Sequence, residues 1–149
     1  MDNLIISISG IRGIVGESLT EKDSYTSTGL FFKTYLKRQK GQLKLIVGRD
    51  IKPTGELLLK GAIASLLAHG VKNVENLGIT SLPAMEWAVN HFRASGGIFI
   101  TASHNPMEWN GIKFISSFQD GGSLLPASAM EKIKDGWRSE VNKIKKREI

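Results

Sequence analysis

The sequence has 149 residues, of which 41% are hydrophobic and 23% are charged; it contains no cysteine and carries a formal net charge of +6. This length and composition are typical of one globular domain, here residues 1–149, and no apolar run approaches the roughly 20 residues that cross a bilayer. The absence of cysteine excludes a disulfide framework and thiolate metal sites, and the first residues lack a secretory signal, so we expect a cytoplasmic protein with no membrane partner.

The first predicted strand, at residues 5–8, ends in Ser9-Gly10-Ile11-Arg12-Gly13. Two glycines that flank an arginine permit positive φ and close backbone approach, which leaves Arg12 projecting from a loop. Arginine matches phosphate oxygens bidentately, so an anion site is one interpretation. A surface arginine in a turn is the other, and these residues alone favour it.

Strands and helices alternate along the rest of the chain. Thr20 and Asp23 have the spacing of a capping box, which predicts a helix that begins at Thr20 and ends at Gly41. Thr54 is the expected cap of a second helix, and Gly70 follows its end. The other patterns predict strands at 43–47, 71–77, 98–100 and 112–118, a helix that begins within 78–83 and a last helix from Pro126.

This alternation predicts the fold class. Strands that alternate with helices imply an α/β fold, here a three-layer α/β/α sandwich with a mixed, mainly parallel sheet. The loop between segments 98–100 and 112–118 is too short to contain a crossover helix. We therefore expect segment 112–118 to be an antiparallel strand at the edge of the sheet.

The pair Arg49-Asp50 follows the predicted strand at 43–47. It could be a catalytic or metal-binding pair, or a structural ion pair or loop brace. One carboxylate does not hold Mg²⁺ without partner ligands, so the structural interpretation is preferred.

The last predicted helix carries an apolar stripe and much of the net charge. The stripe must pack on the body of the domain or on a following domain. Between residues 132 and 149 there are seven basic and three acidic side chains. Because aromatic residues are not interleaved with them as in single-stranded nucleic-acid binders, we interpret the segment as a solvated helix end and expect no nucleic-acid partner. The stripe consists of Met130, Ile133, Trp137, Val141 and Ile144.

The stretch 96–113 holds the main candidate site. Residues 98–100 predict a buried strand, and Ser103 lies just past its carboxyl end, which is the edge where open α/β sheets bind ligands. Ser103 offers a hydroxyl that can carry a group. Lys113, brought back by the Asn110-Gly111 turn, offers a charge for phosphate oxygens. This combination favours phosphoryl transfer.

Serine hydrolase chemistry fits the same stretch less well. No Gly-x-Ser-x-Gly elbow surrounds Ser103. His104 is its immediate neighbour, where an imidazole does not easily reach the serine Oγ as the base of a triad does.

The motif Thr101-Ala102-Ser103-His104-Asn105-Pro106, followed by Asn110-Gly111-Ile112-Lys113, resembles the phosphoserine loop of the α-D-phosphohexomutases. These are the phosphoglucomutases, phosphomannomutases and phosphoglucosamine mutases. Ser9-Gly10-Ile11-Arg12-Gly13 resembles their N-terminal signature. The resemblance covers essentially the whole chain but only the first of the family's four domains, and it implies the same three-layer fold. The chain departs from the family at Ser7, where glycine is frequent, and at Lys52, where arginine is common in the Val-Gly-x-Asp-x-Arg pattern.

The resemblance implies a mechanism. A phosphorylated Ser103 donates its phosphoryl group to a hexose 1- or 6-phosphate and recovers one from the other position of a hexose 1,6-bisphosphate. Mg²⁺ is bound through the Ser103 phosphate, with its remaining ligands from a later domain. The implied site residues are Ser103, Arg12, Lys113 and His104 for catalysis, and Asn105, Asn110, Arg12 and Lys113 for binding of substrate or phosphate.

The sequence lacks the rest of the family's machinery. It has no Asp-x-Asp-x-Asp run for Mg²⁺, no sugar-recognition loop and no phosphate clamp resembling the family's last domain. We therefore expect the N-terminal domain of a phosphoglucomutase/phosphomannomutase that is inactive alone and that works on a phosphorylated hexose with the remaining domains of the enzyme. The alternatives are a phosphoglucosamine mutase, a non-catalytic phosphosugar-binding module, and a basic domain whose tail binds nucleic acid.

Overall fold

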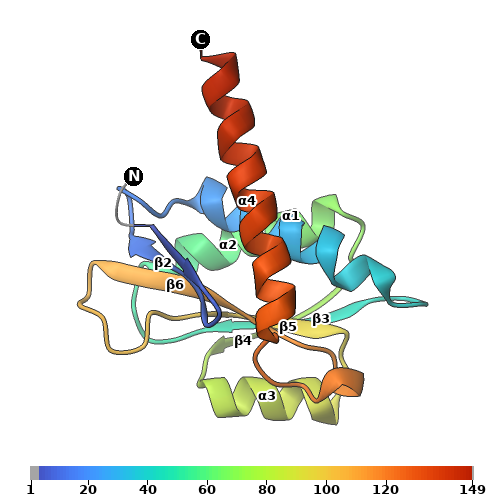
Figure 1. Ribbon diagram of the computed structural model, residues 1–149. Helices are drawn as coiled ribbons and strands as arrows, with labels where there is room; N and C mark the ends of the chain where they lie inside the picture. Colours follow the sequence, from blue (N-terminus) through green and yellow to red (C-terminus); the bar gives the residue numbers. More distant parts are fainter. Residues whose placement is uncertain (1–3, 149) are drawn as a thin grey trace.

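Six strands form one mixed sheet within residues 4–148, the part of the chain that the computed structural model describes (Figure 1). Helices cover both faces of this sheet. The strands are β1 (Ile5–Ser7), β2 (Gly10–Ile14), β3 (Lys44–Arg49), β4 (Asn73–Ile79), β5 (Gly96–Ile100) and β6 (Trp109–Ile115). The helices are α1 (Glu21–Thr34), α2 (Gly55–Ala68), α3 (Leu82–His91) and α4 (Ala127–Arg147), with short 3₁₀ helices η1 (Leu36–Arg38) and η2 (Phe118–Asp120).

The strand order is β1-β2-β6-β5-β3-β4. Strand β3 is parallel to β4 and β5, whereas β6 is antiparallel to both β5 and β2. Four strands, β2 to β5, therefore run in one direction, and β1 is an antiparallel edge strand. The α/β/α sandwich with a mixed sheet is thus confirmed.

The position of the predicted strand at 112–118 was wrong. It forms β6, which is antiparallel as expected but lies inside the sheet. The reason is the N-terminal hairpin of β1 and β2, which pairs along the free side of β6 from Ile11↔Ile112 to Ile14↔Trp109. This pairing joins segments about 100 residues apart, which local sequence patterns do not reveal.

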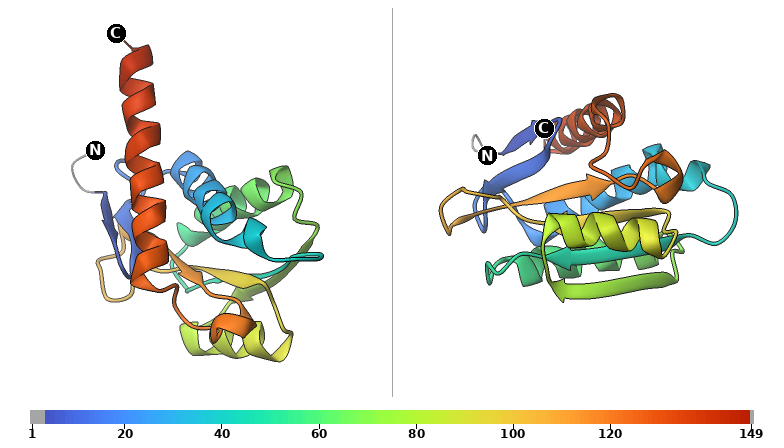
Figure 2. Two further views of the ribbon diagram at one scale, coloured as in Figure 1. Left: turned by 45° about the vertical axis from the view of Figure 1, so that its right-hand side comes forward. Right: turned by 90° about the horizontal axis from the view of Figure 1, so that it is seen from below.

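The core has two parts, one on each face of the sheet. Helices α1 and α2 and the first half of α4 cover one face, and α3 covers the other (Figures 1 and 2). Strand β5 shows why both faces are apolar: Ile98 and Ile100 point into the larger cluster, while Phe99 points into the smaller one under α3. All five residues of β5 are buried. The sheet edge that follows β5 is therefore held by a rigid central strand.

The capping box of α1 is confirmed. The backbone N–H of Asp23 donates to Thr20 Oγ1, and Asp23 Oδ2 accepts from the backbone N–H of Thr20. The predicted end at Gly41 was wrong, because α1 ends at Thr34 and the chain continues as η1. Tyr35 leaves the helical conformation at φ −130°, where tertiary contacts hold its side chain.

Tyr35 ties the end of α1 to the segment before α4. Its hydroxyl donates to Asp120 Oδ2 at 2.6 Å and accepts from the backbone N–H of Ser117 at 2.8 Å. Burial of the ring, together with the hydrogen bond to Asp120, raises the pKa of Tyr35 above its ordinary value. The folded structure therefore favours the protonated phenol, whose proton makes the hydrogen bond to Asp120.

The apolar stripe of α4 packs on the body of the domain over its first half only. Met130 and Ile133 are buried in the larger core cluster, and Trp137 packs against it. Farther along, α4 extends away from the sheet (Figure 2), and the Ile144 side chain is 46% exposed. Within residues 4–148, no helix is long and apolar enough to cross a membrane.

Candidate active site

Ser103 lies three residues past the end of β5, in the exposed loop that leads to β6. The parallel neighbour β3 ends at the same edge, which brings the β3–α2 loop beside it. The backbone N–H of Asp50 donates to the carbonyl of Ile100 at 3.0 Å, and Thr101 Oγ1 donates to Asp50 Oδ2 at 2.7 Å. The candidate site is thus built at the carboxyl ends of two central strands.

The backbone of Ser103 is in the left-handed region, with φ +55°. Its N–H donates to Thr101 Oγ1 at 3.0 Å, and its hydroxyl oxygen accepts from Lys113 Nζ at 3.3 Å. A residue with a Cβ is strained in this conformation. The turn thus presents the exposed Ser103 hydroxyl beside an ammonium group.

Arg12 reaches the same loop from β2. Its Nη1 donates to Asn105 Oδ1 at 3.2 Å. We expected Arg12 on a loop, but the turn is at Ile8-Ser9, and Gly10, at φ +125°, already begins β2. In the sheet, Arg12 is opposite Gly111, where an added Cβ would lie 3.0 Å from Arg12 Cγ. The bare backbone of Gly111 lets the Arg12 side chain pass toward the loop.

Two predicted site residues, Asn110 and His104, do not take part in the contacts that the described structure makes around Ser103. Asn110 is fully buried: its Nδ2 donates to Thr54 Oγ1 at 3.0 Å, and its Oδ1 accepts from the N–H of Gly111 at 2.9 Å. Thr54 does not cap α2 with its side chain, contrary to expectation, because its backbone is already helical at φ −63° and ψ −19°. His104 is exposed, and among residues 4–148 its imidazole has no hydrogen-bond partner. The structure therefore brings Ser103, Lys113, Arg12 and Asn105 together, but it places Asn110 in the interior.

Arg49 braces the β3–α2 loop. Its Nη1 donates to the carbonyls of Asp50 at 3.2 Å and Lys52 at 3.3 Å. The predicted loop brace is confirmed, whereas an Arg49–Asp50 ion pair is not formed in the described structure.

Sequence reasoning missed the role of Lys52 in the site. Only 6% of its surface is exposed, and its ammonium donates to the carbonyls of Asn105, Pro106 and Trp109. The signal that could have identified it is its position in the Gly-x-Asp-x-Arg-like segment, where a basic side chain follows the aspartate by two residues.

The side chains of this site do not form a Mg²⁺ site by themselves. In the described part of the chain, no three histidine or acidic side chains gather as metal ligands do. Asp50, the carboxylate beside the loop, already accepts from Thr101 Oγ1 and from the N–H of Lys52. A phosphate on Ser103 would supply oxygen ligands, but the other ligands of a cation would have to come from elsewhere.

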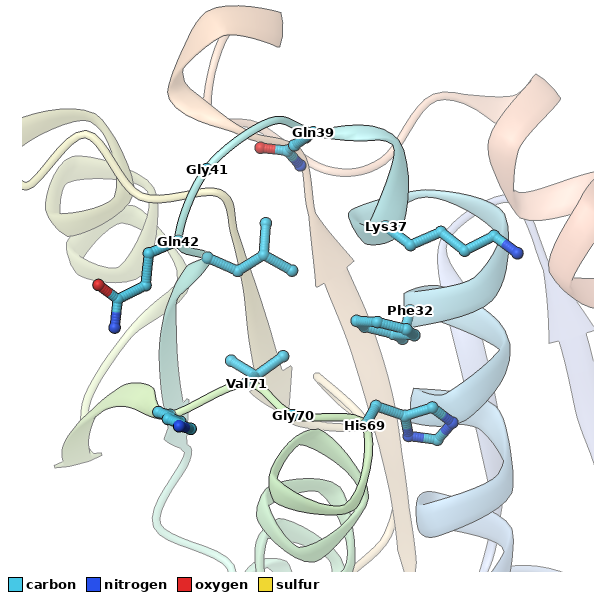
Figure 3. A pocket seen from close by; sticks show the side chains of 10 residues that line it. Phe32, Lys37, Gln39, Gly41, Gln42, His69, Gly70 and Val71 are labelled. Atoms are coloured by element: carbon cyan, nitrogen blue, oxygen red, sulfur yellow. The ribbon is translucent and has the colours of Figure 1, made fainter.

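A cavity that does not include Ser103 is shown in Figure 3. It has a volume of about 470 Å³ and is lined by Phe32, His69, Val71 and Leu43, next to the starts of β3 and β4. Because β3 is parallel to β4 and β5, this is the edge opposite Ser103. We place the site at Ser103 because polar groups that suit an anion converge there.

Most of the chain is similar to known phosphohexomutases. The family model described as "Phosphoglucomutase/phosphomannomutase, alpha/beta/alpha domain I" matches residues 4–144. A phosphoglucomutase/phosphomannomutase from Thermococcus kodakarensis is 46% identical over 107 residues, which are 71% of this chain and 23% of that protein. A phosphoglucosamine mutase from Shouchella clausii is 37% identical over 122 residues, which are 82% of this chain and 26% of that protein.

Solved structures show the same fold. A protein from Thermus thermophilus with a provisional phosphomannomutase assignment superimposes with a TM-score of 0.77 at 25% identity, over 89% of this chain and 29% of that one. The chain thus spans about a quarter of the length of the relatives it matches. On the match over residues 4–144, the chain belongs to the phosphoglucomutase/phosphomannomutase family, in which it corresponds to the α/β/α domain I.

Proposed function

We propose that this chain is the phosphoserine-carrying domain of a phosphohexomutase, with Ser103 as the phosphoryl carrier. The observation that carries the proposal is the contact of 3.3 Å between Lys113 Nζ and the exposed Ser103 Oγ, at the sheet edge where α/β proteins bind ligands. The relatives named as mutases support the reaction class, an isomerisation of hexose phosphates.

The charge arrangement suits a phosphoserine. A phosphate on Ser103 would carry a charge of about −1.5 to −2. Lys113 already donates to Ser103 Oγ, and the Arg12 guanidinium donates to Asn105 Oδ1 in the same loop. Phosphoryl transfer asks mainly for positioning and for stabilisation of charge on the phosphoryl oxygens and the leaving oxygen.

In the transfer step, a hydroxyl oxygen of the hexose phosphate attacks phosphorus and the bond between phosphorus and Ser103 Oγ breaks. The proton leaves the sugar hydroxyl, and Ser103 Oγ regains one as it becomes a hydroxyl. Lys113 stabilises the negative charge on Oγ through its hydrogen bond. Arg12 binds the non-bridging phosphoryl oxygens, for which Asn105 holds it in place. The reverse step rephosphorylates Ser103 from the other position of the hexose 1,6-bisphosphate.

Asn110 takes a positioning role in this proposal, because its buried amide joins the start of β6 to Thr54. His104 remains a proposed catalytic group, since its exposed imidazole is adjacent to Ser103 in the chain. Mg²⁺ is expected to bind a Ser103 phosphate with ligands from outside this domain, and no step above depends on it.

The favoured substrates are glucose or mannose phosphates, and glucosamine phosphate is the alternative. The greater identity to the Thermococcus protein than to the Shouchella phosphoglucosamine mutase supports this order. The remaining domains of the enzyme are the expected partners of this one, so residues 1–149 alone are expected to be inactive.

The test is a discharge experiment on the protein in the longest form found in its native cells. The phosphorylated protein is mixed with glucose 1-phosphate, mannose 1-phosphate or glucosamine 1-phosphate. The amount of phosphoryl group that remains on the protein is then measured over time. We expect discharge to glucose or mannose phosphate. Tight sugar-phosphate binding without any discharge would favour the non-catalytic binding module. Interconversion of hexose 1- and 6-phosphates by residues 1–149 alone would contradict the expected inactivity.

A further inference from the structure

Lys52 is a buried lysine that has no carboxylate partner in the described structure. Its Nζ donates to the carbonyl oxygens of Asn105 at 2.8 Å, Pro106 at 3.0 Å and Trp109 at 3.0 Å. The ion pairs within residues 4–148 involve only side chains of α4. A buried lysine is rare unless its charge is compensated, so these three carbonyls explain why the ammonium is tolerated.

The number of hydrogen bonds fits the charged form. A protonated lysine has three N–H donors and no acceptor, and here all three are used on three separate carbonyls. The carbonyls of Asn105 and Pro106 belong to the loop between β5 and β6, and that of Trp109 belongs to the first residue of β6. The loop residues from Ser103 to Glu108 are half or fully exposed. The ammonium therefore holds this exposed segment in place through hydrogen bonds, as a packed core holds buried segments.

Lys52 is connected to Ser103 from the backbone side as well. Its own N–H donates to Asp50 Oδ1 at 3.0 Å, and the other oxygen of Asp50 accepts from Thr101 Oγ1, which in turn accepts from the N–H of Ser103. On the opposite side of the loop, Asn105 gives its carbonyl to Lys52 and its side-chain oxygen to Arg12. Lys52 thus contacts the groups that hold both Ser103 and Arg12.

We propose that Lys52 is a positioning residue, whose ammonium fixes the segment from Asn105 to the start of β6 at Trp109 and so presets the distance between Ser103 and Arg12. It does not touch the transferred group. The effect on phosphoryl transfer rests on the proposed function above, whereas the effect on the order of the loop does not.

The first experiment measures amide hydrogen exchange in Lys52→Met, which removes the three donors but keeps an unbranched side chain. Lys60→Met is the matched control, because Lys60 is exposed on α2. We expect exchange in peptides that cover residues 102–110 to be about tenfold faster in Lys52→Met, with β3 and β5 unchanged. An unchanged loop in a folded Lys52→Met protein would overturn the proposal, as would an equal acceleration across the whole sheet.

The second readout is the rate at which Ser103 is phosphorylated by a hexose 1,6-bisphosphate. We expect Lys52→Met to lower the maximal rate by about tenfold or more with a smaller change in the concentration for half-maximal rate, and Lys52→Arg to recover most of it, since arginine keeps the charge and several donors. A mobile loop with an unaltered rate would overturn the positioning role. If the unaltered protein is never phosphorylated, the proposed function fails while the exchange result still decides the role of Lys52 in the loop.

A third measurement needs no variant, in case Lys52→Met does not fold. The ammonium protons of exposed lysines exchange rapidly with water, whereas three hydrogen bonds in a buried site protect them. We expect one slowly exchanging lysine ammonium signal in the nuclear magnetic resonance spectrum, assigned through the side-chain carbons of Lys52. Its absence would overturn the proposal.

Discussion

The ammonium of Lys113 lies 3.3 Å from the hydroxyl oxygen of Ser103, although ten residues separate them in the chain. The contact arises because β5 and β6 are antiparallel neighbours, paired from Gly97↔Ile115 to Ile100↔Ile112. Lys113 therefore comes from a strand that the sheet holds, whereas Ser103 comes from the loop. A strand within the sheet thus positions a cation beside a more exposed hydroxyl group.

Replacement of Lys113 by methionine should slow phosphorylation of Ser103 by a hexose 1,6-bisphosphate by about 100-fold, because removal of one preorganised donor to a developing oxyanion costs about that much. Lys60→Met is the control and should leave the rate unchanged. Single-turnover labelling measures both. A Lys113→Met rate equal to that of the control would exclude Lys113 from the reaction.

Ser103→Gly should be more stable than Ser103→Ala by roughly 0.5 to 1 kcal/mol, although neither variant can be phosphorylated at this position. At φ +55° a Cβ is strained, and glycine removes the strain at the cost of some entropy in the unfolded chain. Urea unfolding measures the difference. The same pair of substitutions at Arg93, with φ +53°, gives a comparison outside the site. A glycine variant less stable than the alanine variant would show that the turn is not strained.

Gly111→Ala should lower the free energy of unfolding by about 3 kcal/mol, because an added Cβ would lie 2.5 Å from the carbonyl oxygen of Ile11 and 2.7 Å from that of Thr101. Gly41→Ala is the control: Gly41 has φ +83° but open space around it, so only backbone strain of about 1 kcal/mol is expected. Chemical denaturation distinguishes them. Equal losses in the two variants would contradict the close packing of β2 on β6 at Arg12.

Tyr35→Phe should cost about 1 kcal/mol of stability near neutral pH, through loss of the hydrogen bond to Asp120. Because the pKa of Tyr35 is raised in the folded protein, its contribution is complete below the ordinary value of 10.0 and is lost as the pH rises through the folded value. The stability difference between the parent protein and the variant should therefore shrink above about pH 10. Urea unfolding at several alkaline pH values measures it, and a constant difference would contradict the raised pKa.

Features that depend on nearby residues were predictable from the sequence. The capping box of Thr20 and Asp23 and the strand before Ser103 involve residues a few positions apart, and the α/β class follows from their alternation. The proximity of Lys113 to Ser103 is confirmed, but the Asn110-Gly111 turn from which it was predicted is wrong: both residues lie within β6, and the antiparallel pairing of β5 and β6 brings Lys113 back.

Features that depend on contacts between distant parts of the chain were not predictable from the sequence. The inward position of β6 requires the hairpin of β1 and β2, and the burial of Lys52 requires carbonyls 53 to 57 residues away. Asn110 turns inward because Thr54, 56 residues earlier, offers a partner for a buried amide. No local pattern predicts the contacts of Lys52, Asn110 and Thr54, since each is a polar residue in a loop-like stretch of sequence.

The proposed function depends on Ser103 as the carrier of the phosphoryl group. The most direct test is intact-mass measurement with peptide mapping on the longest native form of the protein and on its Ser103→Ala variant, after exposure to a hexose 1,6-bisphosphate. We expect one added phosphoryl group, located on Ser103 and absent from the variant. An unmodified Ser103 in the folded protein, or a phosphoryl group that persists in the variant, would contradict it.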